Sequence, residues 1–277
     1  MATREDFVNG GPTFRMQVNG MFGSGKSRLA MTFPKVFYVG TEPGGIDFLH
    51  LPENRELLGN LVEYEIVLPD ENTDIRELLK DPTVNKTGQE EMGRIYKATR
   101  RGKELYTKGE VKTLVLDNLT YLAEMKWMEI DKYGKVFSAK TGNLDTQAMY
   151  GNLARWLYRF VLTEICTFKG NVVVTCHLRK ESEEAMAEKL DKTQDVVPNI
   201  LGGFRNQSEG MFGASIYLER KVEPDKTRFI AYCEKVKAMG STINAKNRYG
   251  LPAIVENVSY QTLMKAMTGE VVNKGGK

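Results

Sequence analysis

The most constraining feature of the sequence is Gly20-Met-Phe-Gly-Ser-Gly-Lys-Ser27, which matches the pattern GxxxxGK[ST] in full. Its glycines let the backbone turn tightly, so that successive N–H groups point inward at phosphate oxygens. The pattern predicts that Lys26 reaches the β- and γ-phosphates of a nucleoside triphosphate and that the Ser27 hydroxyl binds Mg²⁺. The residues expected to contact the nucleotide are Gly20, Met21, Phe22, Gly23, Ser24, Gly25, Lys26, Ser27 and Arg28.

A carboxylate that holds the metal ion is expected at the end of a neighbouring buried strand. Thr113-Leu-Val-Leu-Asp117 supplies it, because four strand-like residues end in an acid. The alternative for Asp117 is the N-cap of a helix over Leu119–Tyr133. Next to the phosphate motif, we interpret Asp117 as the second metal-binding residue beside Ser27.

Two other strand-like segments end in polar side chains suited to hydrolysis, which needs a group that polarises the attacking water. Val36-Phe-Tyr-Val-Gly-Thr-Glu42 makes Glu42 the candidate base, with a turn residue as the alternative. Asn171-Val-Val-Val-Thr-Cys-His177 ends in Thr175 and His177, either of which can touch the γ-phosphate. A purely structural His177 is the other interpretation.

Strand-like segments alternate with helix-like ones, which predicts an α/β fold with a mostly parallel central sheet flanked by helices. The expected strands are Phe14–Asn19, Val36–Val39, Leu61–Val67, Thr113–Leu116, Asn171–Thr175, Ser215–Leu218 and Arg228–Glu234. The expected helices are Lys26–Thr32, Ile75–Lys80, Glu90–Leu105, Leu119–Tyr133 and Thr146–Phe168. Phe14-Arg-Met-Gln-Val-Asn19 alternates apolar and polar residues, which is unusual for the strand that leads into a phosphate loop.

Composition excludes several classes of function. The three cysteines form no CxxC pair and there are only two histidines, which argues against a structural zinc site and a disulfide framework. No apolar stretch approaches the roughly 20 residues that span a bilayer, so no membrane partner is expected. The N-terminus has no apolar segment typical of a signal peptide. We therefore expect a cytoplasmic protein.

The expected organisation is a tail at residues 1–12, a core at 13–256, and a C-terminal helix and tail at 257–277. Within the core, residues 85–110 form a basic helical segment and residues 178–212 a loop region. The net charge of +3 is too small to indicate a nucleic-acid partner by itself, so any such site must come from local clusters. The basic segment is either such a cluster or a solvated helix.

The order of these motifs resembles the RecA-like core P-loop ATPases. Phe33-Pro-Lys-Val-Phe-Tyr-Val39, Tyr150-Gly-Asn-Leu-Ala-Arg-Trp156 and Lys246-Asn-Arg-Tyr-Gly-Leu-Pro252 also resemble phage nucleotide-binding proteins that include ATP-dependent single-strand annealing proteins. The resemblance covers residues 14–252, and it implies the host cytoplasm as the compartment if a phage encodes the protein. The chain is short beside full recombinases, which favours annealing over strand exchange.

The resemblance implies further roles. Glu42 matches the family's catalytic glutamate and His177 its γ-phosphate sensor, and the loop after His177 corresponds to a DNA-binding loop. The basic residues of that loop are Arg179, Lys180 and Arg205, beside the acids Glu181, Glu183 and Glu184. A solvated or oligomer-contact loop is the alternative. Lys235 and Lys237 resemble paired cations that enter a neighbouring subunit's ATP site, with Lys246 and Arg248 as rival candidates.

The implied function is slow, DNA-stimulated ATP hydrolysis with Mg²⁺ by a homo-oligomer on single-stranded DNA. The implied setting is recombination, annealing or replication, with a single-strand binding protein or a helicase as a further partner. Two alternatives stay open: a helicase-loader-like accessory ATPase, and a nucleotide-gated binding protein with little turnover. ATP rather than GTP rests on the resemblance, because the sequence has no evident base-reading motif.

Overall fold

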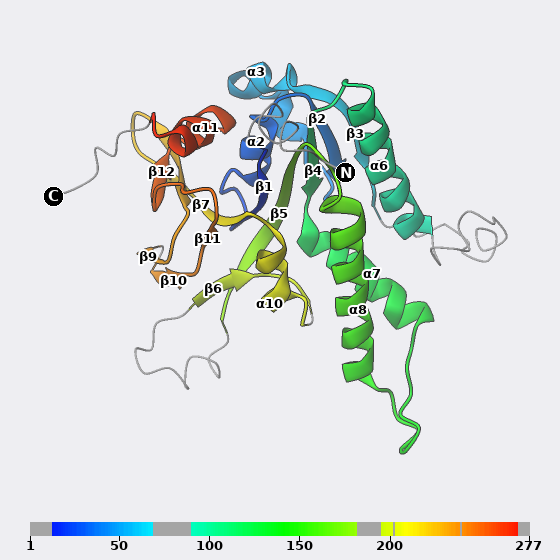
Figure 1. The fold of residues 1–277 in the computed structure, drawn as a ribbon. Coiled ribbons are helices and arrows are strands. Elements are labelled where there is room, and N and C mark those ends of the chain that lie inside the picture. Colours follow the sequence, from blue (N-terminus) through cyan, green and yellow to red (C-terminus); the bar gives the residue numbers. More distant parts are fainter. Residues whose placement is uncertain (1–12, 69–89, 182–194, 202, 239, 271–277) are drawn as a thin grey trace.

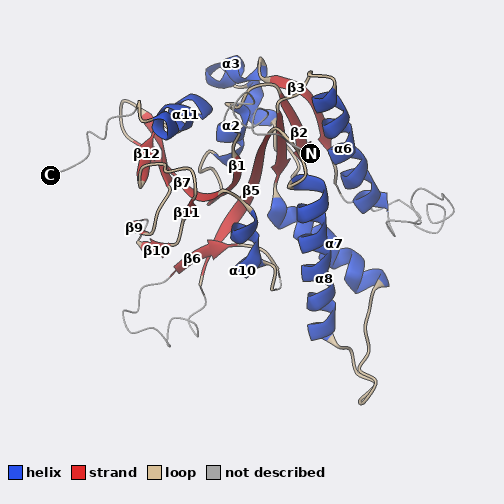
Figure 2. Ribbon diagram, viewed as in Figure 1, coloured by secondary structure: helices blue, strands red, loops and turns tan. Residues whose placement is uncertain are grey.

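The computed structural model describes residues 13–68, 90–181, 195–201, 203–238 and 240–270. Its centre is a parallel sheet covered by helices on both faces, as the sequence predicts (Figures 1 and 2). The parallel strands are, in spatial order, β7 (Ala214–Val222), β1 (Arg15–Gly20), β5 (Asn171–Lys180), β4 (Thr113–Asp117), β2 (Val36–Gly40) and β3 (Leu61–Ile66). The fold is therefore α/β, with a mostly parallel central sheet flanked by helices.

Antiparallel strands extend this sheet on the β7 side. They are β8 (Thr227–Tyr232), β12 (Ile254–Glu256) and β11 (Lys246–Asn247). The far end of β5 also pairs antiparallel with β6 (Asp195–Pro198), which joins β10 (Ser241–Ile243) and β9 (Val236–Ala238). The region expected to be a loop at 178–212 thus contains strand pairing, because β5 runs on to Lys180. It also contains the short helical turns α10 (Arg205–Ser208) and η4 (Glu209–Met211).

The helices divide between the two faces of the sheet. One face is covered by α6 (Glu90–Thr107), α7 (Leu119–Tyr133) and α8 (Thr146–Phe160), and the other by α2 (Lys26–Met31), α3 (Arg55–Leu58) and α11 (Tyr260–Thr268). Short 3₁₀ turns η1 (Asp47–His50) and η2 (Pro52–Asn54) precede α3. The helix expected over 146–168 continues past Phe160 as a π-helical turn, η3 (Val161–Ile165). The helix expected over Ile75–Lys80 lies outside the described residues.

Strand register brings the predicted site residues to one edge of the sheet. Gly20 at the end of β1 lies opposite His177 of β5, and Gly40 at the end of β2 lies opposite Asp117 of β4. Because these strands are parallel, their carboxyl ends meet at the same edge. Residues far apart in sequence are thereby assembled into one site.

The alternation of β1 has a physical explanation. Gln17 and Asn19 are buried in the sheet, and Gln17 Nε2 donates to Asn19 Oδ1 at 2.8 Å. Asn19 Nδ2 donates to Ser215 Oγ, and Ser215 Oγ donates to Glu209 Oε1, each at 2.8 Å. Polar residues are tolerated in this central strand because they bond along a buried row. Gln17 Oε1 is left without a partner within the described residues.

Candidate nucleotide-binding site

The phosphate loop connects β1 to α2 and its shape requires glycine. Gly25 has a left-handed backbone with φ of 94°, and a side chain there would collide with the ring of Phe229. A side chain at Gly20 would collide with the Ser24 side chain. These two positions therefore tolerate only the residue without a Cβ.

The loop has the features of an anion cradle. The Ser24 hydroxyl is buried and has no hydrogen-bond partner among the described residues. Lys26 is buried, and its Nζ donates to the carbonyl oxygens of Gly20 and Met21, each at 3.0 Å. Burial lowers the pKa of Lys26, while the Asp117 and Glu42 carboxylates act in the opposite direction. A buried cation and an unsatisfied hydroxyl fit a triphosphate.

Asp117 is held by two hydroxyls. The Tyr38 hydroxyl donates to Asp117 Oδ2 at 2.7 Å, and Thr175 Oγ1 donates to Asp117 Oδ1. The Tyr38 hydroxyl also lies within hydrogen-bonding reach of the Ser27 side chain. Burial raises the pKa of Tyr38, and the Asp117 charge adds to the rise, so this phenol stays protonated and can donate. Ser27 and Asp117 thus meet around one phenol, as residues that would hold Mg²⁺.

Asp117 is not the N-cap of α7, so that alternative is wrong. The cap is Asn118, whose Oδ1 accepts a hydrogen bond from Tyr121 N at 2.8 Å. Asn118 is missing from the sequence-based set of candidate site residues. It is fully buried, and the Thr41 hydroxyl both donates to its carbonyl oxygen and accepts from its N–H. Its side-chain Nδ2 points toward Glu42.

A hydrogen-bonded row links the phosphate lysine to Glu42. Lys26 Nζ lies 3.1 Å from His177 Nδ1, and His177 Nε2 lies 3.4 Å from Glu42 Oε2. Asn118 Nδ2 donates to the same Glu42 oxygen at 2.7 Å. Because Lys26 only donates, His177 Nδ1 accepts, and the ring proton sits on Nε2 facing Glu42. The hydrogen bond from His177 lowers the pKa of Glu42 and keeps it a carboxylate near neutral pH.

Three further neighbouring residues contact His177 and hold it in position. Its backbone N–H donates to Thr120 Oγ1 at 3.0 Å, and the exposed Phe22 of the phosphate loop stacks on its ring with centroids 3.9 Å apart. Tyr121 meets the ring edge-on at 5.8 Å. Glu42 and His177, which the sequence places separately near the phosphate loop, thus contact each other there, and Phe22 connects the loop to the ring directly.

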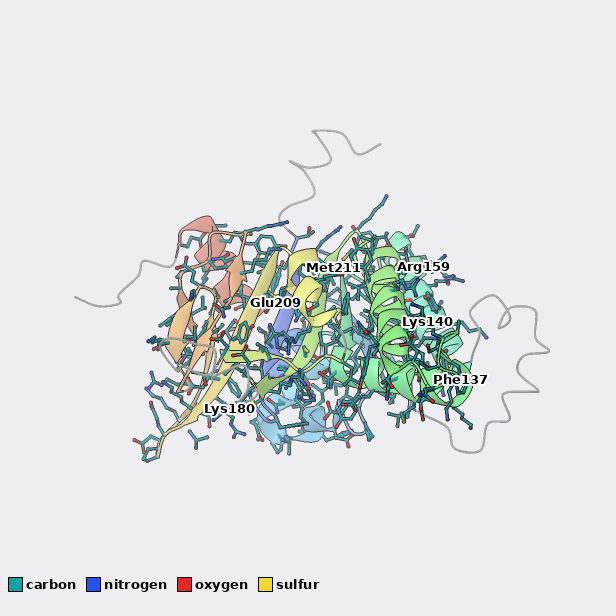
Figure 3. All side chains as sticks on the ribbon, turned by 90° about the horizontal axis from the view of Figure 1, so that it is seen from below. Phe137, Lys140, Arg159, Lys180, Glu209 and Met211 are labelled. Atoms are coloured by element: carbon teal, nitrogen blue, oxygen red, sulfur yellow. The ribbon has the colours of Figure 1, made fainter. Side chains whose placement is uncertain are left out.

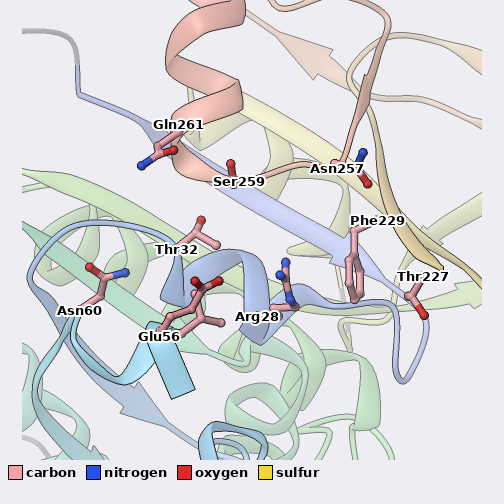
Figure 4. Close-up of a pocket in the computed structure, with 10 residues that line it drawn as sticks. Arg28, Thr32, Glu56, Asn60, Thr227, Phe229, Asn257, Ser259 and Gln261 are labelled. Atoms are coloured by element: carbon pink, nitrogen blue, oxygen red, sulfur yellow. The ribbon is translucent and has the colours of Figure 1, made fainter. Parts of the chain in front are cut away.

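A cavity of about 560 Å³ opens over these groups. The phosphate loop, Glu42 and His177 line one part of it, and η1, η2 and the β7–β8 hairpin line the rest. A second pocket of about 420 Å³ adjoins it and shares Arg28, Thr227 and Phe229 (Figure 4). The side chains around the second pocket are mostly polar and come from α2, α3, β8 and the start of α11. Together the two pockets are large enough for a nucleoside triphosphate.

The other predicted residues lie outside this cavity within one chain. Lys237 in β9 and Lys235 just before it are both exposed, so a role in a neighbouring subunit stays a prediction. Lys246, the alternative candidate for this role, is held within its own chain. Its Nζ donates to the carbonyl oxygens of Glu209, Gly210 and Phe212. Arg179 and Lys180 are exposed at the end of β5, whereas Arg205 is half-buried in α10.

Sequence reasoning did not find Tyr38, Arg220 or Phe229. Tyr38 sits in the middle of an apolar strand and gives no pattern that separates it from a core residue. Arg220 and Phe229 face each other across the β7–β8 hairpin and reach the cavity only through that pairing. Asn118 was within reach of the sequence, because it directly follows Asp117.

The fold and this site define the class of protein: a nucleotide-binding ATPase domain built on a mostly parallel sheet. The chain belongs to the AAA domain family, whose model matches residues 13–253. No curated protein matches the chain. Among solved structures it is similar to a KaiC-like protein from the hyperthermophilic archaeon Pyrococcus horikoshii OT3. That similarity amounts to 12% identity over 79% of this chain and 76% of that chain, with a TM-score of 0.32.

No helix in the described part of the chain is long and apolar enough to cross a membrane.

Proposed function

We propose that this chain hydrolyses ATP with Mg²⁺ and acts on single-stranded DNA as a homo-oligomer. The observation that carries the hydrolysis is the row from Lys26 through His177 to Glu42. It places an ionised carboxylate, held by two donors, beside the lysine expected to bind the γ-phosphate. A fixed acceptor at this place is what the attacking water needs.

Each group has a distinct part in the proposed reaction. Lys26 neutralises the terminal phosphates, and the loop N–H groups hold their oxygens. Ser27 and Asp117 hold Mg²⁺, which neutralises charge on the phosphate oxygens when bound. Glu42 takes the proton of the attacking water, and His177 senses the terminal phosphate through its contact with Lys26. Loss of that phosphate would free Lys26 to move, and His177 leads directly to the exposed end of β5.

The nucleoside is proposed to extend from Arg28 into the pocket of Figure 4. Asn60, Asn257 and Gln261 line that pocket and offer amide donors and acceptors, and the Phe229 ring offers an apolar surface. Amides that both donate and accept can bond the edge of a base. We expect ATP to compete out a bound fluorescent nucleotide at lower concentration than GTP. Equal competition by ATP and GTP would show that this pocket does not distinguish the two bases.

Two exposed features support the proposed contact with single-stranded DNA. In Figure 3, Lys180 at the end of β5 lies toward the lower left of the view, and Phe137 and Lys140 of the connection between α7 and α8 lie toward its right side. Phe137 is 61% exposed, so its ring is accessible for stacking. Cations for the backbone and an aromatic ring for base stacking are the usual elements of single-strand binding. The helix α6 has less support, because Arg101 pairs with Glu63 and Lys103 with Glu164.

The test is ATP hydrolysis with and without single-stranded DNA, using Lys26→Ala as the blank. We expect several-fold stimulation that is absent in the blank. Phosphate-dominated binding should also weaken with salt, with a log–log slope of about −0.7 per phosphate contact. Unstimulated hydrolysis together with salt-independent DNA binding would contradict the DNA role and favour a loader that acts on a protein partner. Nucleotide binding without turnover would favour a nucleotide-gated scaffold.

A paired substitution tests the proposed surface. Phe137→Ala with Lys140→Ala should weaken single-strand binding at least several-fold, because it removes one stacking ring and one cation. Lys226→Ala on the β7–β8 hairpin is the matched control, since Lys226 is also exposed but lies on a different part of the chain. Equal DNA affinity in both proteins would remove the α7–α8 connection from the DNA surface.

A further inference from the structure

The hairpin formed by β7 and β8 carries four basic side chains, and three of them have acidic partners. Lys221 Nζ lies 3.6 Å from Glu219 Oε2, and Lys226 Nζ lies 3.9 Å from Glu223 Oε2. Arg228 pairs with Glu223 and also with Glu256 at 3.4 Å. The fourth is Arg220, whose guanidinium has no hydrogen bond or ion pair within the described residues.

Arg220 also differs from the other three in where it lies. Alternate residues of a strand share a face, and Leu218 of β7 belongs to the core on the α2 side of the sheet. Arg220 is therefore on that face, and it lines the same cavity as Lys26 and Ser27. The unpaired cation of the hairpin is thus the one that faces the phosphate loop.

The neighbour of Arg220 fixes its position relative to the loop. Arg220 lies directly opposite Phe229 in the β7–β8 register. The Phe229 ring covers Gly25 of the loop, and the Arg28 guanidinium lies 4.7 Å from the ring centroid. Arg220 is therefore beside the second half of the loop, where α2 begins, and not beside the end of β5.

This position selects the part of the nucleotide that Arg220 can reach. The groups for the terminal phosphate, His177 and Glu42, lie on the β5 side of β1, whereas β7 borders β1 on the opposite side. Two acids line the cavity, Glu42 and Glu53. Glu42 is held by His177 and Asn118, and Glu53 is an exposed residue of η2. An arginine in this setting suits phosphate oxygens, because its planar fork donates two parallel hydrogen bonds.

We propose that Arg220 binds the α- and β-phosphate oxygens of the nucleotide held by its own chain. It is a binding residue that acts equally on substrate and product, and it takes no part in breaking the β–γ bond. The inference rests on nucleotide binding at the phosphate loop and not on the proposed DNA role. It also explains why the hairpin keeps one cation without an acidic partner, while the other three are paired.

The test is ADP affinity in the full chain with Mg²⁺ and without DNA, measured by calorimetric titration. Arg220→Ala should weaken ADP binding about tenfold, the effect of one charge-assisted contact. Arg220→Lys should restore part of the loss, since it keeps the charge without the fork. Lys221→Ala is the matched control, because Lys221 is the next residue, points to the other face and pairs with Glu219. Its ADP affinity should stay within about twofold of the wild type.

A second readout separates this role from catalysis. In Arg220→Ala the KM for ATP should rise about tenfold while kcat stays within about twofold, because a uniform binding contact was removed. Unchanged ADP affinity would overturn the proposal. If kcat also fell, the result would place Arg220 on the terminal phosphate instead. A wild-type chain that binds no ADP would overturn the nucleotide site as a whole, which is a separate result.

Discussion

The two sides of β1 are built differently. On the β5 side, Lys26, His177, Glu42 and Asp117 are each held by hydrogen bonds to neighbouring side chains or carbonyls. On the β7 side, the cavity is lined by Arg220, which has no such partner within the described residues. The mostly polar second pocket adjoins the cavity at Phe229. On the side proposed to carry the chemistry, the side chains are oriented by hydrogen bonds before the ligand binds. On the side proposed to carry binding, the Arg220 side chain has no such partner within the described residues.

This difference has a physical basis. Groups that stabilise charge in a transition state act best when they are already oriented, because no reorganisation is then needed during the reaction. Groups that hold the unreactive part of a substrate need only be complementary once it has bound. Substitutions on the β5 side should therefore lower kcat, and those on the β7 side should raise KM.

The largest effect is expected for Lys26→Ala, which removes the cation of the β5 side. Turnover should fall about 1000-fold, because the developing charge on the terminal phosphate loses its partner. His177 would also lose the donor to Nδ1, so its contact with Glu42 should loosen. Hydrolysis assays with Lys265→Ala as the exposed-lysine control test this. A residual rate above a tenth of the wild type would contradict the assignment.

A smaller effect is expected for Asp117→Asn. The amide keeps the shape but removes the negative charge that would hold Mg²⁺, so turnover should fall about 100-fold. The Mg²⁺ concentration that gives half of the maximal rate should rise, which a titration at saturating ATP measures. An unchanged Mg²⁺ requirement would show that Asp117 does not hold the ion and would weaken the contrast between the two sides.

Tyr38→Phe tests whether the β5 side is preorganised through a residue that touches neither water nor phosphate. The loss of one hydrogen bond to Asp117 should lower the Mg²⁺ affinity about tenfold. Tyr64→Phe is the matched control, because Tyr64 lies on the edge strand β3 and its side chain is 53% exposed. Identical Mg²⁺ titrations for both variants would sink this positioning role.

The smallest expected change is in the pH dependence. Because the hydrogen bond from His177 lowers the pKa of Glu42, the base stays active until the pH falls through that lowered value. His177→Gln removes the ring donor, so the pKa of Glu42 should rise and the acid limb of kcat against pH should move to higher pH. An acid limb that stays in place would mean that Glu42 is not the group that titrates.

The sequence predicted the parts of this site that lie at strand ends and missed those that depend on pairing. Asp117 ends β4, Glu42 follows β2, and His177 follows the buried apolar run of β5, and parallel register brings them together. Tyr38 could not be separated from a core residue, because its role depends on a contact with Asp117 across neighbouring strands. Arg220 enters the site only because β8 folds back on β7. The extension of β5 to Lys180 was missed because its partner β6 lies beyond an intervening segment.

The most direct test of the account is steady-state ATP hydrolysis by Glu42→Gln alongside its affinity for ATP. The amide keeps the hydrogen-bonding shape next to Asn118 and His177 but cannot take a proton from water. The account predicts that kcat falls about 100-fold or more while the Kd for ATP changes by less than about threefold. A kcat close to that of the wild type would show that another group activates the water and would contradict the catalytic role of the β5 side.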